Sequence, residues 1–342
     1  MATHRDALRM LDANANRAAE GLRVLEDIAR FITDDQRAAG IAKELRHELR
    51  RAIPAAALAE RDTPGDLGKD LPNPDGRRTR LVDMLRANAA RVQEALRAAE
   101  ESARLCTPTA VPVLESARYR SYSLESALLS RLPAWLLHRV RLYALIDTAL
   151  CDAPLAVAAA VARGGAGAVQ LRAKALGVRA YRELAERMQA AVRAEGALFI
   201  VNDHVAVARA IQSDGVHVGQ DDLWLADVRA VVGASCAIGV SAHTSEQAHS
   251  AVAAGADYLG LGPVFPTATK PHEPCRGPEL LDTLKGRLGV PSYAIGGLDL
   301  ERVSALRHRL PHGVAVAGAL CRAADPEAAA QALHLVLEPE DA

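Results

Sequence analysis

Apolar positions in the first 138 residues recur with the period of an α-helix. Between Leu8 and Ala29 they fall at steps of three and four residues, which predicts one long amphipathic helix. Similar runs predict further helices over Ile41–Ile53, Thr79–Leu105 and Pro112–Leu132. The segment 62–76 is rich in Pro, Gly and Asp, and we expect it to be a loop. This part of the chain is therefore predicted to be an all-α helical bundle.

The pattern changes at Val140, where short apolar runs begin to alternate with Ala-rich helical stretches. Eight such runs are predicted as strands: Arg141–Ile146, Ala168–Leu171, Ala197–Val201, Gly215–Val218, Cys236–Val240, Asp257–Gly262, Pro291–Ile295 and Gly313–Val316. Strands that alternate with helices form parallel sheets, and eight units of this size suit a closed barrel. We predict an α/β fold, a (β/α)8 TIM barrel over 139–342, preceded by the helical bundle over 1–138.

The helical part contains an internal repeat, in which residues 13–26 align with residues 87–100. The matched pairs are Asn14 with Asn88, Arg17 with Arg91, Glu20 with Glu94, Arg23 with Arg97 and Glu26 with Glu100. Two copies predict a pseudo-symmetric bundle of two helical hairpins. In a functional interpretation, the repeated polar residues, together with Asn16, face each other and bracket a polar ligand. In a structural interpretation, they form salt-bridged surfaces of a docking or oligomerisation domain.

Composition narrows the class of protein. The formal net charge is −1, which gives no argument for a nucleic-acid or membrane partner. The five cysteines are far apart and form no CxxC pair, so neither a disulfide framework nor a zinc site is expected. The N-terminus lacks the apolar core of a secretory signal, and no apolar run is long enough for a membrane helix. We expect a cytoplasmic protein that acts on small molecules, with homo-oligomerisation left open.

Polar side chains gather where the predicted strands end. After the second strand, Gln170, Arg172 and Lys174 alternate with Leu171, so the amide and both cations point to one face. Only five of the 41 basic residues are Lys, which makes Lys174 and Lys270 notable. Two cations and an amide at a barrel mouth suit a pyrophosphate, whereas a solvated strand end is the plainer alternative.

The third and fourth predicted strands are followed by carboxylates. Asp203 and Asp222 would lie at neighbouring strand ends, and Mg2+ commonly takes one or two carboxylates and completes its shell with waters and phosphate oxygens. We therefore predict that Asp203 and Asp222 bind Mg2+. Either residue alone could instead cap the following helix.

The later strand ends predict a lid and a phosphate site. Thr267, Thr269 and Lys270 lie on a Pro-bounded loop after the sixth strand, which is long enough to close over a ligand. Gly297 and Gly318 follow strands seven and eight, where this fold commonly binds phosphate through backbone N–H groups.

These motifs resemble those of thiamine-phosphate synthases over roughly residues 140–335. The resemblance is carried by Gln170-Leu-Arg-Ala-Lys174, Val201-Asn-Asp203, Val218-Gly-Gln-Asp-Asp222, Gly239-Val-Ser-Ala-His243, Gly260-Leu-Gly-Pro-Val-Phe-Pro-Thr-Ala-Thr-Lys270 and Ile295-Gly-Gly297. It implies a Mg2+-dependent transferase that couples 4-amino-2-methyl-5-hydroxymethylpyrimidine diphosphate to 4-methyl-5-(2-phosphoethyl)thiazole and releases pyrophosphate.

The resemblance also implies roles for individual residues. The pyrimidine diphosphate would be held by Gln170, Leu171, Arg172, Ala173, Lys174, Asn202, Ser241 and Lys270, with Arg172, Lys174, Ser241 and Lys270 as catalytic residues. The thiazole phosphate would be held by Thr267, Ala268, Thr269, Gly297, Ala317 and Gly318. Asp203 and Asp222 would be the Mg2+ ligands. One departure is that Ala317-Gly318 stands where the family usually has Ile-Ser or Val-Ser, which removes a hydroxyl.

Other functions are weighed against this one. A thiazole tautomerase, an isomerase of similar fold, has no use for a diphosphate site, and a non-catalytic phosphate sensor would not need polar residues in both halves. The segment 12–27 resembles a helical domain that is often fused ahead of thiamine-phosphate synthases and has been proposed to phosphorylate hydroxymethylpyrimidine phosphate. That part of the chain has no P-loop; the loop 62–70 could approach phosphates or simply join helices.

Overall fold

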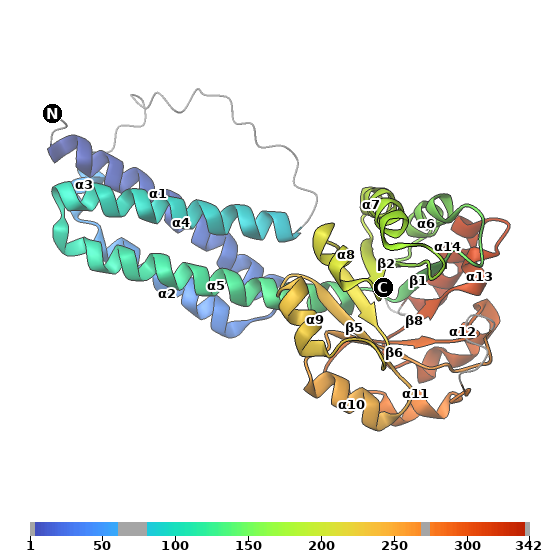
Figure 1. Cartoon of the computed structure of the whole chain (residues 1–342). Helices are drawn as coiled ribbons and strands as arrows, with labels where there is room; N and C mark the ends of the chain where they lie inside the picture. The colour runs from blue at the N-terminus through green and yellow to red at the C-terminus, as the bar shows by residue number, and fades with distance from the viewer. Residues whose placement is uncertain (1–3, 61–80, 268–273, 339–342) are drawn as a thin grey trace. The chain divides into compact units, whose positions relative to one another are not determined.

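The computed structural model describes residues 4–60, 81–267 and 274–338 of the 342-residue chain. Contacts divide the chain into two compact units, Met1–Leu132 and Pro133–Ala342. The predicted boundary after residue 138 falls at the end of a continuous helix, α5 (Val111–His138). Figure 1 shows the two units, a helical bundle and an α/β barrel. Among the described residues, every helix is too short or too polar to cross a membrane.

The first unit is helical, as the periodicity predicts. Its elements are α1 (His4–Phe31), α2 (Gln36–Ala52), α3 (Ala55–Ala59), α4 (Leu81–Cys106), the short 3-10 helix η1 (Pro108–Ala110) and most of α5. Helix α2 begins five residues before the predicted start because the Asp35 side chain accepts a hydrogen bond from the Ala38 N–H and caps the helix. The predicted loop over 62–76 lies outside the described residues.

The second unit is a closed barrel of eight parallel strands in sequence order, which confirms the predicted fold. The strands are β1 (Leu142–Asp147), β2 (Ala168–Arg172), β3 (Leu198–Asn202), β4 (Gly215–Val218), β5 (Ala237–Ala242), β6 (Tyr258–Leu261), β7 (Ser292–Ile295) and β8 (Gly313–Val316). Between and after them lie α6 (Pro154–Arg163), α7 (Val178–Ala194), α8 (Val205–Ala210), α9 (Leu225–Val232), α10 (Ser245–Ala253), α11 (Glu279–Leu284), α12 (Leu300–Leu306), the 3-10 helix η2 (Arg307–Arg309), α13 (Gly318–Cys321) and α14 (Pro326–Leu337). Pairing of Leu142 with Val314 closes the barrel between β1 and β8.

Alternate residues along each strand serve two different cores. Leu142, Ala144 and Ile146 are buried in the large apolar layer between strands and helices. Tyr143 points the other way, into the barrel interior, where it packs beside Tyr258 and Tyr293 with ring centroids 5.3–6.0 Å apart. Three of the six tyrosines of this chain thus lie at the barrel axis, where large side chains are needed to fill the space.

The N-terminal end of the barrel is closed by Leu137, which is fully buried against the tyrosine layer. Its carbonyl accepts a hydrogen bond of 2.8 Å from the Tyr293 hydroxyl and lies 3.3 Å from Nε2 of His312. Burial, with Arg141 nearby, lowers the pKa of His312 to about 4, so this imidazole is neutral at pH 7. Neutral Nδ1 then accepts from the Arg141 guanidinium at 3.2 Å.

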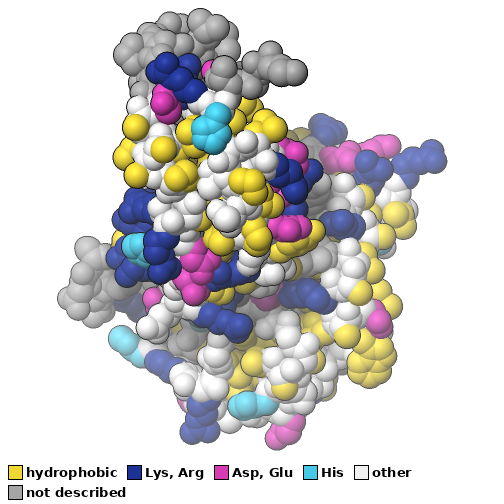
Figure 2. Space-filling model, turned by 90° about the vertical axis from the view of Figure 1, so that its left-hand side faces the viewer, with side chains coloured by type: hydrophobic (Ala, Val, Ile, Leu, Met, Phe, Trp, Pro, Cys, Tyr) yellow, Lys and Arg dark blue, Asp and Glu magenta, His cyan; other side chains and the backbone are white. Residues whose placement is uncertain are grey.

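Basic and acidic side chains intermix on the face shown in Figure 2, in keeping with the formal net charge of −1. Charge of one sign therefore does not dominate that face.

Gly239 on β5 provides a test of the tyrosine layer. A Cβ atom at this position would lie 2.0–2.4 Å from carbons of the Tyr258 ring. We expect Gly239→Ala to lower the free energy of unfolding by at least about 1–3 kcal/mol, because the ring has no space to withdraw into. Urea denaturation measures this. Gly177→Ala, where a Cβ meets no atom within 4 Å, is the control and should be close to neutral; equal effects of the two substitutions would contradict the packing argument.

Candidate active site

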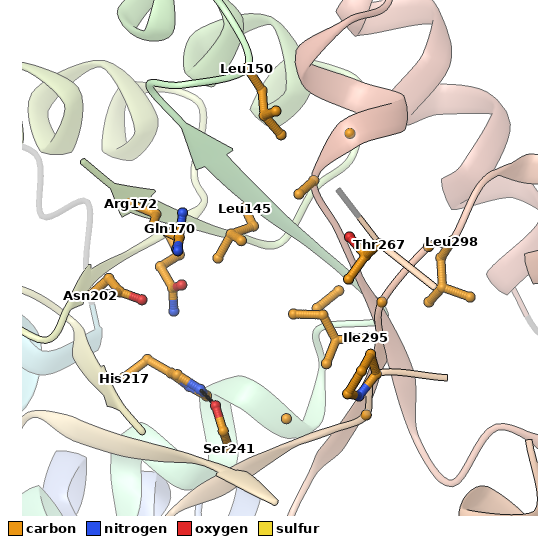
Figure 3. A pocket seen from close by; sticks show the side chains of 18 of the residues that line it. Leu145, Leu150, Gln170, Arg172, Asn202, His217, Ser241, Thr267, Ile295 and Leu298 are labelled. Carbon is orange, nitrogen blue, oxygen red and sulfur yellow. Dashed lines mark hydrogen bonds between the residues drawn. The ribbon is translucent and has the colours of Figure 1, made fainter. Parts of the chain in front are cut away.

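A cavity of about 420 Å3 opens at the C-terminal ends of the barrel strands, and all eight strands or the loops that follow them contribute to its wall. Figure 3 shows one side of the cavity with the polar side chains of Gln170, Arg172, Asn202, His217 and Ser241. The opposite side has Thr267 and the apolar side chains of Ile295 and Leu298. The cavity therefore has a strongly polar half beside β2–β5 and a half near β7 and β8 whose lining is mostly glycine, alanine and apolar side chains. This is the end of the fold at which βα loops build active sites.

The predicted cationic cluster assembles in the polar half. Gln170, Arg172 and Lys174 all line the cavity. The intervening Leu171 and Ala173 are instead buried in the layer between strands and helices, so their side chains face away from it. Alternation along β2 therefore divides the five-residue segment into three lining side chains and two packing ones.

Arg172 is held in place by a carboxylate that the sequence argument missed. Its guanidinium forms an ion pair with Asp147, the last residue of β1, which is 2% exposed and pairs with Arg172 in the strand register. Asp147 also accepts a hydrogen bond from the Ala149 N–H at 3.0 Å. The sequence feature that could have identified Asp147 is its position as the charged last residue of a mostly apolar strand.

Both candidate metal ligands, Asp203 and Asp222, line the same polar half. Asp203 forms an ion pair with Lys174, and its φ of 60° places a non-glycine residue in the left-handed region, which is a strained conformation typical of functional sites. Asp222 accepts a hydrogen bond from the Gly219 N–H at 2.6 Å. Among the described residues no group of three or more His, Cys, Asp or Glu side chains surrounds a common point. The donor set is thus two carboxylates beside open space, which fits Mg2+ that completes its shell with water and phosphate oxygens.

Ser241 lies at the end of a buried chain of hydrogen bonds that crosses the barrel. Gln170 donates to the Tyr143 hydroxyl at 2.9 Å, and that hydroxyl lies 3.1 Å from the Tyr258 hydroxyl. Tyr258 in turn lies 3.2 Å from Nδ1 of His217, whose Nε2 is 3.1 Å from the Ser241 hydroxyl. The chain fixes both Gln170 and Ser241, the two neutral polar groups at the floor of the cavity. Burial raises the pKa of both Tyr143 and Tyr258, which keeps their hydroxyls protonated.

His217 was missed by the sequence argument, although it lies in the predicted fourth strand. The signal that could have identified it is a polar residue between two apolar ones, Val216 and Val218. Successive side chains of a strand point to opposite faces, and both valines are buried between strands and helices, so His217 points into the barrel.

Backbone geometry shapes the other half of the cavity. Gly296 and Gly297 adopt φ values of 104° and 62°, and a Cβ at Gly297 would lie 2.5 Å from the Pro266 carbonyl oxygen. Both positions therefore require glycine. Thr267, Ala317 and Gly318 line this half as well, and so does Arg322, a cation that the sequence argument did not identify. Ala268, Thr269 and Lys270 lie outside the described residues.

In the helical unit the repeated Asn–Arg pairs are bonded within single helices. Arg17 donates to Asn14 on α1, and Arg91 donates to Asn88 on α4, both at 3.3 Å. Three other candidate residues, Asn16, Glu20 and Arg23, line a separate cavity beside α1. Glu94 is exposed on α4.

Comparison with known proteins agrees with this geometry. Residues 142–320 match the family model "Thiamine monophosphate synthase", and residues 9–127 match the "ThiD2 family". The thiamine-phosphate synthase of Gloeobacter violaceus is 40% identical over 330 residues, which cover 93% of each chain. That of Nostoc punctiforme is 37% identical and covers 95% of this chain and 92% of its own. Among solved structures, the thiamine phosphate pyrophosphorylase of Pyrococcus furiosus is 30% identical, with a TM-score of 0.55, and covers 59% of this chain and 97% of its own.

The ion pair between Asp147 and Arg172 yields a stability prediction. In Asp147→Ala the largely buried Arg172, whose side chain is 16% exposed, loses its counter-charge. We expect the free energy of unfolding to fall by about 3 kcal/mol. Asp282→Ala breaks the exposed pair with Arg309 and should have little effect on stability, because solvent screens that pair. Urea denaturation of both variants checks the difference, and a result in which Asp147→Ala is as mild as Asp282→Ala would show that Arg172 does not depend on this pair.

Proposed function

Because the chain belongs to the thiamine-phosphate synthase family, we propose that its barrel joins 4-amino-2-methyl-5-hydroxymethylpyrimidine diphosphate to 4-methyl-5-(2-phosphoethyl)thiazole, giving thiamine phosphate and pyrophosphate. The observation that carries the proposal is similarity to thiamine-phosphate synthases over more than nine-tenths of the chain. The two-sided cavity supports it, since one half suits a diphosphate and the other a single phosphate. A tautomerase would leave the cations and carboxylates of the polar half without a use.

The reaction breaks the bond between the pyrimidine methylene carbon and the diphosphate oxygen, and the electron pair leaves with pyrophosphate. The electron-rich pyrimidine stabilises the resulting methyl cation, and the thiazole nitrogen then forms the new C–N bond. No base is required, because that nitrogen carries no proton. The main task of the protein is to stabilise negative charge on the leaving group, which Arg172, Lys174 and Lys270 would do. Fixed charges act here without reorganisation, and Asp147 keeps Arg172 oriented.

The neutral groups of the polar half would orient the pyrimidine. Gln170, Asn202 and Ser241 line the cavity, and the hydrogen-bond chain through His217 and Tyr258 restricts the rotation of Ser241. We assign Ser241 to contact with the pyrimidine and its leaving group. Such positioning lowers the entropic cost of bringing the reacting atoms into line.

Asp203 and Asp222 would hold Mg2+, which supplies positive charge against the diphosphate when bound. Because Lys174 forms an ion pair with Asp203 in this structure, we expect the lysine to turn toward the diphosphate when the carboxylate is engaged.

The second half of the cavity would hold the thiazole phosphate. Gly297, Ala317 and Gly318 offer backbone N–H groups, and Thr267 offers a hydroxyl. Thr269 and Ala268 are assigned to the same role from the sequence. Since Ala317-Gly318 lacks the hydroxyl usual in the family, we propose that Arg322 supplies charge to the phosphate instead.

The helical unit is proposed to be the kinase that supplies the barrel with its diphosphate substrate. Its support is the match of residues 9–127 to the ThiD2 family and the similarity of both units together to full-length relatives. In the proposed step an oxygen of hydroxymethylpyrimidine phosphate attacks the γ-phosphorus of ATP, the bond between the β and γ phosphates breaks, and ADP leaves. A purely structural role for this unit is the alternative.

The synthase proposal is tested by incubating the full chain with both substrates and Mg2+. We expect thiamine phosphate and pyrophosphate in equal amounts. Chelation by EDTA should abolish turnover, and added Mg2+ should restore it, because two carboxylates and a diphosphate form the predicted site. Failure to form thiamine phosphate under these conditions would refute the assignment, and full activity in EDTA would refute the Mg2+ site alone.

Lys270→Ala tests charge stabilisation of the leaving group. We expect kcat to fall on the order of 10²–10³-fold, because one fixed donor to the developing charge is lost. Lys285→Ala is the matched control: it removes a lysine that bonds the His308 carbonyl outside the cavity, and kcat should be unchanged. Steady-state kinetics on both variants gives the comparison, and a near-wild-type kcat for Lys270→Ala would contradict the proposed role.

The kinase proposal is tested with hydroxymethylpyrimidine phosphate, ATP and Mg2+ on the full chain. We expect ADP release that depends on the pyrimidine, and continued conversion to thiamine phosphate once the thiazole phosphate is added. Chromatography of the nucleotide and pyrimidine products measures both steps. If no pyrimidine-dependent ADP forms while the synthase reaction proceeds from supplied diphosphate, the helical unit is structural.

A further inference from the structure

The helical unit has a cavity of about 620 Å3 beside α1, α2 and the start of α3, a size suited to a small molecule. We call it the first-hairpin pocket. One part of its lining is apolar and includes Leu49, Ile53 and Leu58; the other part is charged or polar and consists of Asp12, Asn16, Glu20, Arg23, Arg46 and Arg50. A pocket with an apolar wall and a few converging polar groups is the usual form of a ligand site.

The two halves of the sequence repeat adopt equivalent structures. Glu26 on α1 and its repeat partner Glu100 on α4 are both buried, and each accepts a 2.6 Å hydrogen bond from an arginine of the next long helix. The arginines are Arg46 on α2 and Arg118 on α5, so α2 corresponds to α5 through this pair. With α1 equivalent to α4 and α2 equivalent to α5, each residue that lines the pocket in the first hairpin has a counterpart in the second.

At those positions the second hairpin carries groups that bond one another. Gln93 and Glu125 replace the pocket residues Ala19 and Ile53, and the Gln93 amide donates to Glu125 at 2.7 Å. Tyr122 replaces Arg50, and its hydroxyl lies 3.4 Å from Nη1 of Arg118. The second hairpin thus uses larger or complementary side chains where the first leaves space.

The first hairpin, in contrast, leaves polar groups unsatisfied at the pocket. Arg118 uses its Nε to bond Glu100, whereas Arg46 bonds Glu26 through Nη2, and its own Nε is buried with no hydrogen-bond partner. Arg50 and Glu20 also line the pocket; both are exposed, and neither bonds another described residue. Buried donors without partners are rare in folded proteins, so an unpaired guanidinium N–H at a pocket indicates a missing acceptor.

We propose that the first-hairpin pocket binds a phosphate monoester of an amino-substituted ring, while the second hairpin is structural. The phosphate oxygens accept from Arg46, Arg50 and Arg23, since guanidinium groups match phosphate geometry. Glu20 accepts from the ring amino group, and the apolar wall of Leu49 and Ile53 packs against the ring. The identity of this ligand rests on the proposed kinase role, for which the pocket would be the acceptor site; the location of the pocket does not.

Hydrogen–deuterium exchange of the full chain, with and without hydroxymethylpyrimidine phosphate, tests the location. We expect added protection in peptides covering residues 12–23 and 46–58, and none in the equivalent segments of α4 and α5. Inorganic phosphate alone and unphosphorylated hydroxymethylpyrimidine alone should each need at least tenfold higher concentration. Equal protection of both hairpins, or none in the helical unit, overturns the proposal; equal protection by phosphate alone overturns the assignment of the ring.

Two variants and a matched control make the test specific to this pocket. Ala19→Gln with Ile53→Glu introduces the filling pair of the second hairpin and should abolish protection of the pocket peptides. Arg50→Ala should weaken binding at least tenfold, whereas Arg51→Ala, which removes the neighbouring exposed arginine that does not line the pocket, should not. Synthase turnover from supplied diphosphate should be unchanged in all three variants, which shows that the barrel unit is folded. Unchanged exchange of the α4 and α5 peptides shows that the helical unit is folded as well.

The outcomes separate the site from the kinase proposal. Pocket protection without any pyrimidine-dependent ADP formation upholds the binding site and rejects the kinase. Kinase turnover with an unchanged KM in the Ala19→Gln, Ile53→Glu variant upholds the kinase and rejects this pocket as its acceptor site.

Discussion

Closure of the eight-stranded barrel is the constraint on which the candidate active site depends. Because all strands are parallel and the β1–β8 pairing completes the ring, every strand delivers its C-terminal residues to one rim. Residues as distant in sequence as Gln170 and Gly318 therefore line one cavity. The alternation of side chains then decides which residues of each strand face that cavity and which hold the surrounding helices.

The interior of the barrel links stability to chemistry. Three tyrosines fill the axis, and two of them carry hydrogen bonds from Gln170 across to His217 and Ser241. Buried polar groups of this kind must be satisfied, and a fully bonded chain holds each member in one orientation. A buried partner also holds a side chain in place in the polar half of the cavity, where the ion pair with Asp147 orients Arg172. Cavity-lining groups are thus held in place by residues behind them, such as Tyr143 and Asp147.

The two hairpins of the helical unit share the buried ion pairs that pack their helices but differ in the side chains around the first-hairpin pocket. The buried pairs Glu26–Arg46 and Glu100–Arg118 are common to both hairpins and fix how each pair of helices packs. Small substitutions around them, Ala19 for Gln93 and Ile53 for Glu125, separate an open pocket from a bonded surface. In this interpretation, one half of the repeat supports the fold and the other has a ligand site.

The sequence by itself determined the fold class, because helix and strand periods are local and eight alternating units leave few arrangements. It also predicted that Gln170, Arg172, Lys174, Asp203 and Asp222 lie together, and they line one cavity because the strand ends of a parallel barrel meet. It missed Asp147, His217 and Arg322, whose importance lies in partners or in a cavity formed by distant parts of the chain. It revealed the repeat, but it could not show that Asn14 and Arg17 bond within their own helix or that Gln93 of the second hairpin bonds Glu125. Side-chain partners across elements depend on packing, which only the tertiary structure decides.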